Sequence, residues 1–192
     1  GVIDDNEGVK IDDPKNEKFI SVESGMNYRS QDRSLSFDIS AYFTEWHDRT
    51  RTLWVQNLIS EDLGGTVSMQ GLDARHMGLE LQGAYQPRDY VRLDAAASFG
   101  SWKHLNNVQG QYKTENQSAP TVTDTLYIKD LKVADAPQSQ LAYAVSLFPH
   151  ESLYIRGQGR TYWNHYAQYD PVDRTKASEE GMAVAELIAG KH

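Results

Sequence analysis

The feature that most constrains this chain is a period-two alternation of apolar and polar side chains, repeated in stretches of about ten residues. In residues 35–43 (LSFDISAYF) every odd-numbered position is apolar, whereas the even-numbered positions are Ser, Asp, Ser and Tyr. Successive side chains of a β-strand point to opposite faces of its sheet, so this pattern predicts a strand with one apolar and one polar face. The same pattern, weaker in the first case, predicts five further strands over residues 19–28, 77–85, 91–99, 141–147 and 153–160.

The lengths of the strands and of their connections favour a transmembrane sheet. Strands of about ten residues exceed the ~5–6 residues usual in globular proteins and match the ~9–11 residues of a tilted membrane strand. Short turns are expected at 30–33, 87–89 and 149–151, and they alternate with long segments at 47–72, at 104–123 and after Trp163. Short turns on one side and long loops on the other are typical of outer-membrane barrels. We therefore predict an all-β, antiparallel up-and-down meander of about six strands from a larger transmembrane β-barrel.

The aromatic residues follow the same division between long and short connections. Trp and Tyr concentrate where membrane strands meet the lipid–water interface, although both residues also simply favour strands. Three Trp are expected at the ends of strands that run into long segments, and four Tyr beside the short turns. The predicted membrane-interface girdle is Trp46, Trp102, Trp163, Tyr28, Tyr85, Tyr90 and Tyr154.

Composition excludes several classes of function. The formal net charge of -8 argues against binding of nucleic acid, which needs a basic surface. The absence of cysteine excludes disulfides, iron–sulfur clusters and thiolate zinc sites. No apolar stretch reaches the ~20 residues of a membrane helix, whereas barrel strands bury only alternate residues and leave a weak hydropathy signal.

Five segments in a characteristic order resemble a known family. They are FISVESGMNY (19–28), LSFDISAYFTEW (35–46), GLELQ followed by YQP (78–87), LYIKDLKVADAPQSQ (126–140) and YWNHYAQYDPVDRT (162–175). Over residues 16–175 the chain resembles the barrel region of TonB-dependent outer-membrane receptors, especially those of the Bacteroidetes type.

This resemblance implies a 22-stranded barrel with an internal plug, located in the cell outer membrane and energised by TonB across the periplasm. The implied function is uptake of an iron chelate, cobalamin or a glycan, without a cofactor and without catalysis. The implied partners are outer-membrane lipid, the remaining barrel and plug of the parent chain, the TonB complex through that parent, and a small ligand.

The chain also departs from the family pattern. It contains no plug domain and no TonB box, and six strands are fewer than the ~8 of the smallest membrane barrels. We therefore expect a fragment of a longer protein. Its expected parts are a loop or linker over 1–17, a partial barrel over 18–175 and a non-barrel tail over 176–192, with a short helix predicted at 178–190.

The polar stripes of the strands predict a water-facing barrel interior. The charged residues expected to face this lumen are Glu23, Asp38, Glu80, Arg92, Arg156 and Arg160. Arg156 and Arg160 are expected to pair with Glu80 and Asp38, the alternative being contact with an anionic substrate. In the long segments the rings expected to bind ligand are Trp54, Tyr166 and Tyr169, and residues 52–58 alternate as if they extended a hairpin beyond the membrane.

No pattern predicts an enzyme or a metal site. His47, His104 and His165 follow the ends of alternate predicted strands, so neighbours in this set would lie roughly 10 Å apart, too far for one zinc ion. There is no G-x-S-x-G elbow and no H-E-x-x-H helix. Glu23 and Glu80 could form a carboxylate pair, but a solvated lumen lining is favoured.

Two alternatives remain open from sequence. One is a soluble, secreted all-β carbohydrate-binding module, in which the charged stripe would face outward. The other is a porin-like or adhesin barrel that works without TonB.

Overall fold

The computed structural model describes residues 15–60, 63–114, 122–134, 136–169 and 171, and this part of the chain is all-β, without helix. The strands are β1 (Lys18–Arg29), β2 (Leu35–Ser60), β3 (Leu63–Arg88), β4 (Val91–His104), β5 (Val108–Thr114), β6 (Val122–Leu126), β7 (Pro137–His150) and β8 (Leu153–His165). The predicted fold class is therefore confirmed. The helix predicted at 178–190 lies outside the described residues.

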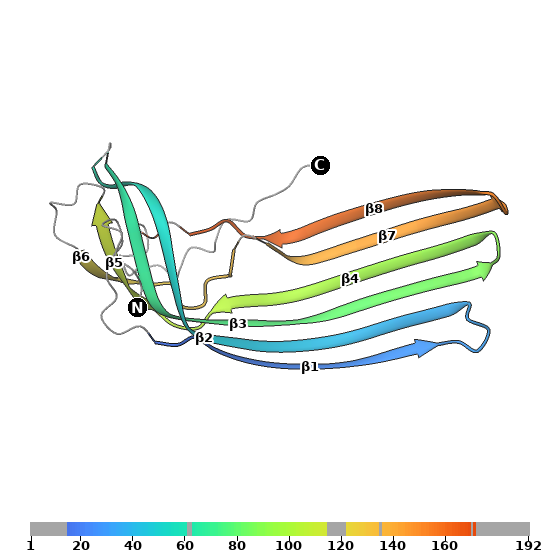
Figure 1. Cartoon of the computed structure of the whole chain (residues 1–192), viewed down its shortest axis with the longest axis horizontal. Coiled ribbons are helices and arrows are strands. Elements are labelled where there is room, and N and C mark those ends of the chain that lie inside the picture. The colour runs from blue at the N-terminus through green and yellow to red at the C-terminus, as the bar shows by residue number, and fades with distance from the viewer. Residues whose placement is uncertain (1–14, 61–62, 115–121, 135, 170, 172–192) are drawn as a thin grey trace.

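Six of the strands form one long antiparallel sheet in the order β1-β2-β3-β4-β7-β8 (Figure 1). β1 pairs with β2 without interruption, from Lys18 opposite His47 to Arg29 opposite Ser36. The tight turns fall where expected, because β1–β2, β3–β4 and β7–β8 are joined by only a few residues. The six predicted strands are thus the six strands of this meander, and the sheet they form is open.

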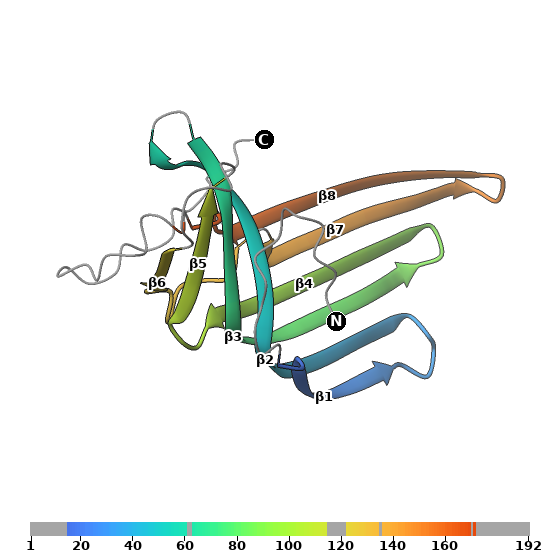
Figure 2. The ribbon, with the colours of Figure 1, turned by 60° about the vertical axis from the view of Figure 1, so that its left-hand side comes forward.

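Where the structure describes the segments 47–72 and 104–123, most of their residues are strand, so the prediction of long loops was wrong there, whereas the hairpin extension expected from residues 52–58 is present. β2 and β3 are 26 residues each and continue as a paired hairpin through the first of these segments. In the second, β5 pairs with β3 and β6 pairs with β5. These strands form a branch of the same sheet, here called the extension, which comprises residues 51–70 of β2 and β3 together with β5 and β6. Figure 2 shows the extension rising from one end of the long sheet.

The bend between the long sheet and the extension has a local cause. The β2–β3 register shifts between Trp46 and Arg49 and again between Arg49 and Arg51. Asp48 and Gly71 both have positive φ, 57° and 70° respectively, on the two strands at this point. Bulges bend a strand and increase its twist, so these irregularities turn the hairpin out of the plane of the long sheet.

The buried core lies in the extension and not on the long sheet. A cluster of apolar side chains packs between the extension and the segments that follow β6 and β8. Its members are Val55, Val67, Met69, Leu72, Val108, Tyr112, Leu126, Ile128, Leu131 and Tyr169. The strand predicted at 52–58 therefore belongs to the extension, whose apolar side chains stabilise it when β5 and β6 pack beside them.

Candidate functional site

The register of the long sheet gathers all its apolar stripes on one face. Ile39 lies opposite Leu81, Leu81 opposite Ala97, and Ala97 opposite Leu141. Directly paired residues of an antiparallel sheet share a face, so one row of apolar side chains crosses β2, β3, β4 and β7. The predicted inward–outward alternation is thus consistent across the strands.

Large apolar side chains on this face are solvent-exposed. Their exposed fractions range from 37% to 63%, and no described residue forms a second layer over them. They are Ile20, Val22, Met26, Tyr28, Leu35, Phe43, Met77, Leu79, Tyr85, Leu93, Phe99, Leu141, Tyr143, Val145, Leu147, Ile155 and Trp163. An apolar surface that spans six strands is far larger than the patches usual on soluble monomers.

The opposite face is polar, and it holds every residue expected to face the lumen. On this face, Ser and Gln residues pair across the strands with the charged residues, from β1 to β8. The charged residues on this face include Glu23, Asp38, Glu80, Arg92, Arg156 and Arg160. The structure places these six on one surface without showing what that surface contacts.

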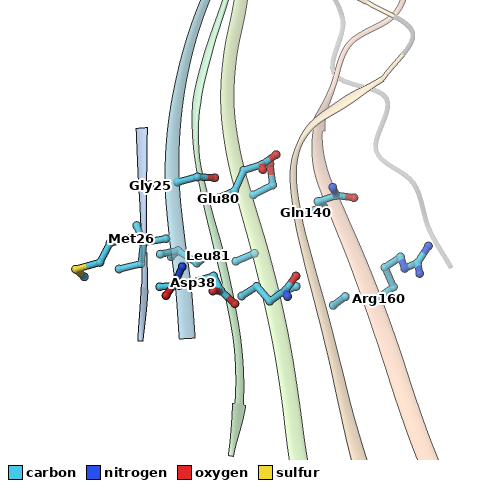
Figure 3. Close-up of a pocket in the computed structure, with 15 residues that line it drawn as sticks. Gly25, Met26, Asp38, Glu80, Leu81, Gln140 and Arg160 are labelled. Atoms are coloured by element: carbon cyan, nitrogen blue, oxygen red, sulfur yellow. The ribbon is translucent and has the colours of Figure 1, made fainter. Parts of the chain in front are cut away.

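Two adjoining hollows lie along the polar face. The first, of about 620 Å³, is lined by Asp38, Glu80 and Arg160 among mainly small and polar residues. Figure 3 shows Arg160 on the far side from Asp38 and Glu80, with β4 and β7 between them. The second hollow, of about 630 Å³, lies nearer the tight turns and is lined by more arginines than carboxylates.

The arginines of β8 do not pair as expected. Asp94 accepts hydrogen bonds from Arg92 Nε at 2.9 Å and from Arg156 at 3.0 Å, and Arg156 also donates to Ser146 Oγ. The carboxylates expected as partners belong to β2 and β3, four and three strands away from β8. At ~4.8 Å per strand these separations are roughly 19 and 14 Å, too long for an ion pair.

Among the described residues Arg160 has one polar contact, a hydrogen bond donated to the hydroxyl of Tyr162 at 3.2 Å. Asp38 lies 3.7 Å from the guanidinium of Arg29 on the neighbouring strand. Ion pairs on this face therefore form between residues no more than two strands apart, the widest being that of Arg156 on β8 with Asp94 on β4.

Two of the three expected girdle tryptophans lie on the wrong face. Trp102 Nε1 donates to the hydroxyl of Tyr42 at 2.8 Å, and this contact crosses β3 over Gly78 on the polar face. Trp46 also lies on the polar face, where its Nε1 donates to Glu17 and its ring stacks under Arg49 at 3.9 Å. Their even residue numbers place them with the polar stripe, so the alternation itself excludes both from a lipid-facing ring.

The remaining aromatics divide in the same way. Trp163, Tyr28 and Tyr85 lie on the apolar face, as an interfacial girdle requires. Tyr90 lies in the turn between β3 and β4, and Tyr154 alternates with Arg156 on the polar side. The predicted girdle is therefore reduced to three residues on the apolar face.

The three aromatic residues expected to bind ligand have different surroundings. Trp54 is 59% exposed on the outer side of the extension, with its ring over Gly64. Tyr166 is partly buried just after β8. Tyr169 is only 7% exposed in the core of the extension, where its hydroxyl meets the sulfur of Met69, so its selection as an exposed ligand contact was wrong.

The three histidines at the strand ends lie in different surroundings. Within the described ranges no group of three His, Cys, Asp or Glu residues could hold a metal ion. His47 lies between the carboxylates of Glu45 and Asp73, at 3.3 and 3.4 Å, beside the bend. His165 ends β8 opposite Pro137.

His104, the last residue of β4, is a buried titratable group that packs against Tyr169 of the core cluster. It is 4% exposed, its Nδ1 has no hydrogen-bond partner in the part of the chain that the structure describes, and its ring meets that of Tyr169 edge-on at 5.8 Å. Burial lowers the pKa of His104 to about 4, with smaller contributions from the charges of Arg49 and Arg51. The imidazole is therefore neutral at physiological pH, and its surroundings favour that form.

Sequence reasoning missed Asp94 and Tyr42 as contact residues of the polar face. The position of Asp94 two residues after Arg92 in the same strand was an available signal, since i and i+2 share a face. The link between Tyr42 and Trp102 depends on the register of three strands and had no such signal.

Comparisons with known proteins return no similarity: no protein family, no curated protein and no solved structure matches this chain. The described part of the chain has no helix that could cross a bilayer.

Proposed function

We propose that this chain is part of the wall of a transmembrane β-barrel in the bacterial outer membrane, within a TonB-dependent receptor that takes up a small ligand. The supporting observation is the exposed apolar face that spans all six strands of the long sheet. In a soluble protein this apolar face would be exposed to water, which costs free energy. On the outer face of a membrane barrel it contacts hydrocarbon, and that cost does not arise.

The dimensions of the long sheet suit this role. The twelve residues of β1 pair with residues 36–47 of β2, before the bend. At ~3.4 Å per residue and a tilt of ~40°, such strands rise about 30 Å, enough for an apolar band ~25 Å tall. The bend at Asp48 and Gly71 then marks the position where the hairpin leaves the membrane.

The edges of the sheet indicate the first partner. Among the described residues β1 pairs only with β2, and β8 only with β7. Unpaired backbone groups in hydrocarbon cost several kcal/mol each, so both edges require further strands. We assign those strands to the rest of the parent barrel, which encloses the polar face as a lumen that holds the plug.

The extension supplies the mouth of this barrel. It lies beyond the bend, at the end of the sheet opposite the tight turns, and exposes Trp54 on its outer side. An exposed aromatic ring at a mouth of this kind can stack on a sugar or on a chelate. The iron chelate, cobalamin or glycan expected from the family resemblance would meet this part of the protein first.

One observation favours the rival module. The extension has a buried core of its own, as a small soluble domain would. That module would also need a second layer over the apolar face of the long sheet, and the described residues provide none. A barrel without TonB would share the same wall and differ in having no plug.

Fractionation of native cells tests the proposal. An antibody raised against the peptide of residues 109–120 should detect the full-length protein in the detergent-extracted outer membrane. We expect a band much larger than 21.7 kDa, with slower migration after boiling as the barrel unfolds. A soluble band near that mass would refute the barrel and favour the secreted module. Loss of uptake on deletion of the energising TonB protein separates a receptor from a porin.

A further inference from the structure

The second hollow on the polar face has a charge opposite to that of the whole chain. Four arginines and two aspartates line this hollow. They leave an excess of two positive charges, in a chain of formal net charge -8. Arg29 comes from the end of β1, Arg92 from β4, and Arg156 and Arg160 from β8. The fold therefore collects these cations from three strands that are distant in sequence.

Small side chains form the floor of this hollow. Ala84, Ala96, Ala142 and Ala144 occupy its centre on β3, β4 and β7, where longer residues would fill the space. The resulting volume of about 630 Å³ lies within the ~300–1,000 Å³ usual for small-molecule sites. The hollow thus combines room for a solute with a cationic rim.

Part of the rim is held in place before any ligand arrives. Asp94 receives Arg92 on one carboxylate oxygen and Arg156 on the other, at 2.9 and 3.0 Å. Each guanidinium has five N–H donors, so these contacts orient the two groups and leave further donors for another partner. Arg160 donates only to the hydroxyl of Tyr162 in the described structure.

We propose that this arginine hollow, formed by Arg29, Arg92, Arg156 and Arg160, binds a small solute that carries at least two phosphate or carboxylate groups. Guanidinium forks match the geometry of both oxyanions, and two negative charges balance the excess of the rim. The neighbouring hollow, with two carboxylates and one arginine, does not offer this charge. The proposal rests on the polar face being the lumen wall of the proposed barrel, and it adds the charge class of the ligand.

Calorimetric titration of the full-length purified protein with inorganic pyrophosphate tests the site. We expect one site per chain, with tighter binding than that of inorganic phosphate, because two phosphate groups can accept hydrogen bonds from more than one of the guanidinium groups on β4 and β8. Arg160→Gln should weaken pyrophosphate binding roughly tenfold, the usual scale for one charged hydrogen bond. Arg160→Lys retains the charge but not the fork, and it should give an intermediate loss.

Arg88→Gln is the matched control, because it removes the same charge from an exposed residue at the β3–β4 turn, outside the hollow. Its affinity should stay within about twofold of wild type, since a distant exposed charge is largely screened by salt. Unchanged circular dichroism in all variants establishes that the sheet is retained.

Equal losses in Arg88→Gln and Arg160→Gln, or no pyrophosphate binding by the wild type, would overturn the proposal. Binding of an acidic peptide at this site in place of pyrophosphate would also overturn it, because the occupant would then be a polypeptide. Failure here is distinguishable from failure of the barrel proposal: an outer-membrane protein that binds no pyrophosphate disproves only the site. A soluble protein that binds it through Arg160 disproves only the barrel.

Discussion

A single charge placed on either side of one strand tests which face of the long sheet meets lipid. Ala96 and Ala97 are adjacent in β4, near the middle of the part that precedes the bend. Ala97 lies on the apolar face between Leu81 and Leu141, and Ala96 on the polar face between Gln82 and Ala142. Replacement of each by Arg adds the same side chain and removes the same methyl group, so only the face differs.

The expected difference is large. An arginine on the lipid face near the bilayer midplane costs about 2–4 kcal/mol in transmembrane barrels, which lowers the folded-to-unfolded ratio roughly 30- to 700-fold. Ala96→Arg enters a hollow that already holds charged groups in water, where added repulsion is screened, so its cost should stay below about 1 kcal/mol. Ala97→Arg is therefore expected to be the less stable variant by about 1–4 kcal/mol.

Unfolding in guanidinium chloride from lipid vesicles, followed by tryptophan fluorescence, measures both free energies of unfolding. The slope of the transition should remain the same in the two variants, so that the midpoints compare stability alone. Equal midpoints, or a lower midpoint for Ala96→Arg, would refute the assignment of lipid to the apolar face.

Three further predictions concern the extension and its bend. The pKa of His104 is about 4 in the folded protein and 6.5 in an ordinary histidine, so the unfolded chain binds the proton more readily. The contribution of His104 to the free energy of unfolding should therefore be complete above about pH 6.5 and fall by roughly 3 kcal/mol toward pH 4. His104→Phe should remove this dependence, as measured by hydrogen exchange of β5 corrected for intrinsic rates, and an unchanged pH profile would contradict it. Tyr169→Ala should cost the extension about 3–5 kcal/mol through a cavity. Tyr169→Phe should cost under about 1 kcal/mol, because among the described residues the hydroxyl bonds to the sulfur of Met69, which is a weak acceptor; equal protease sensitivity of the two variants would disprove this. Gly71→Ala should destabilise the bend by about 1 kcal/mol because of its φ of 70°, and a denaturation midpoint at or above that of wild type would rule out this strain.

The sequence alone determined the six strands of the meander and their two faces. This was possible because the alternation is local: each side chain's face follows from its parity within its own strand. The same parity could have placed Trp46 and Trp102 on the polar face. The prediction failed there because it considered the position of each Trp along its strand and not the face.

Only the tertiary structure decided which residues meet across strands. Arg156 reaches Asp94 because β8 lies beside β7 and two strands from β4, whereas Asp38 is four strands away. Strand order and register bring together residues distant in sequence, and no pattern within one strand specifies them.

The extension shows the same limit most clearly. Residues 47–72 carry enough alternation to predict a longer hairpin, but not the core that holds it. That core needs Tyr169 to pack against Met69, 100 residues earlier, and it needs β5 and β6 to cover β3. Local periodicity fixes the direction in which a side chain points, whereas the long-range packing of the chain decides what it meets there.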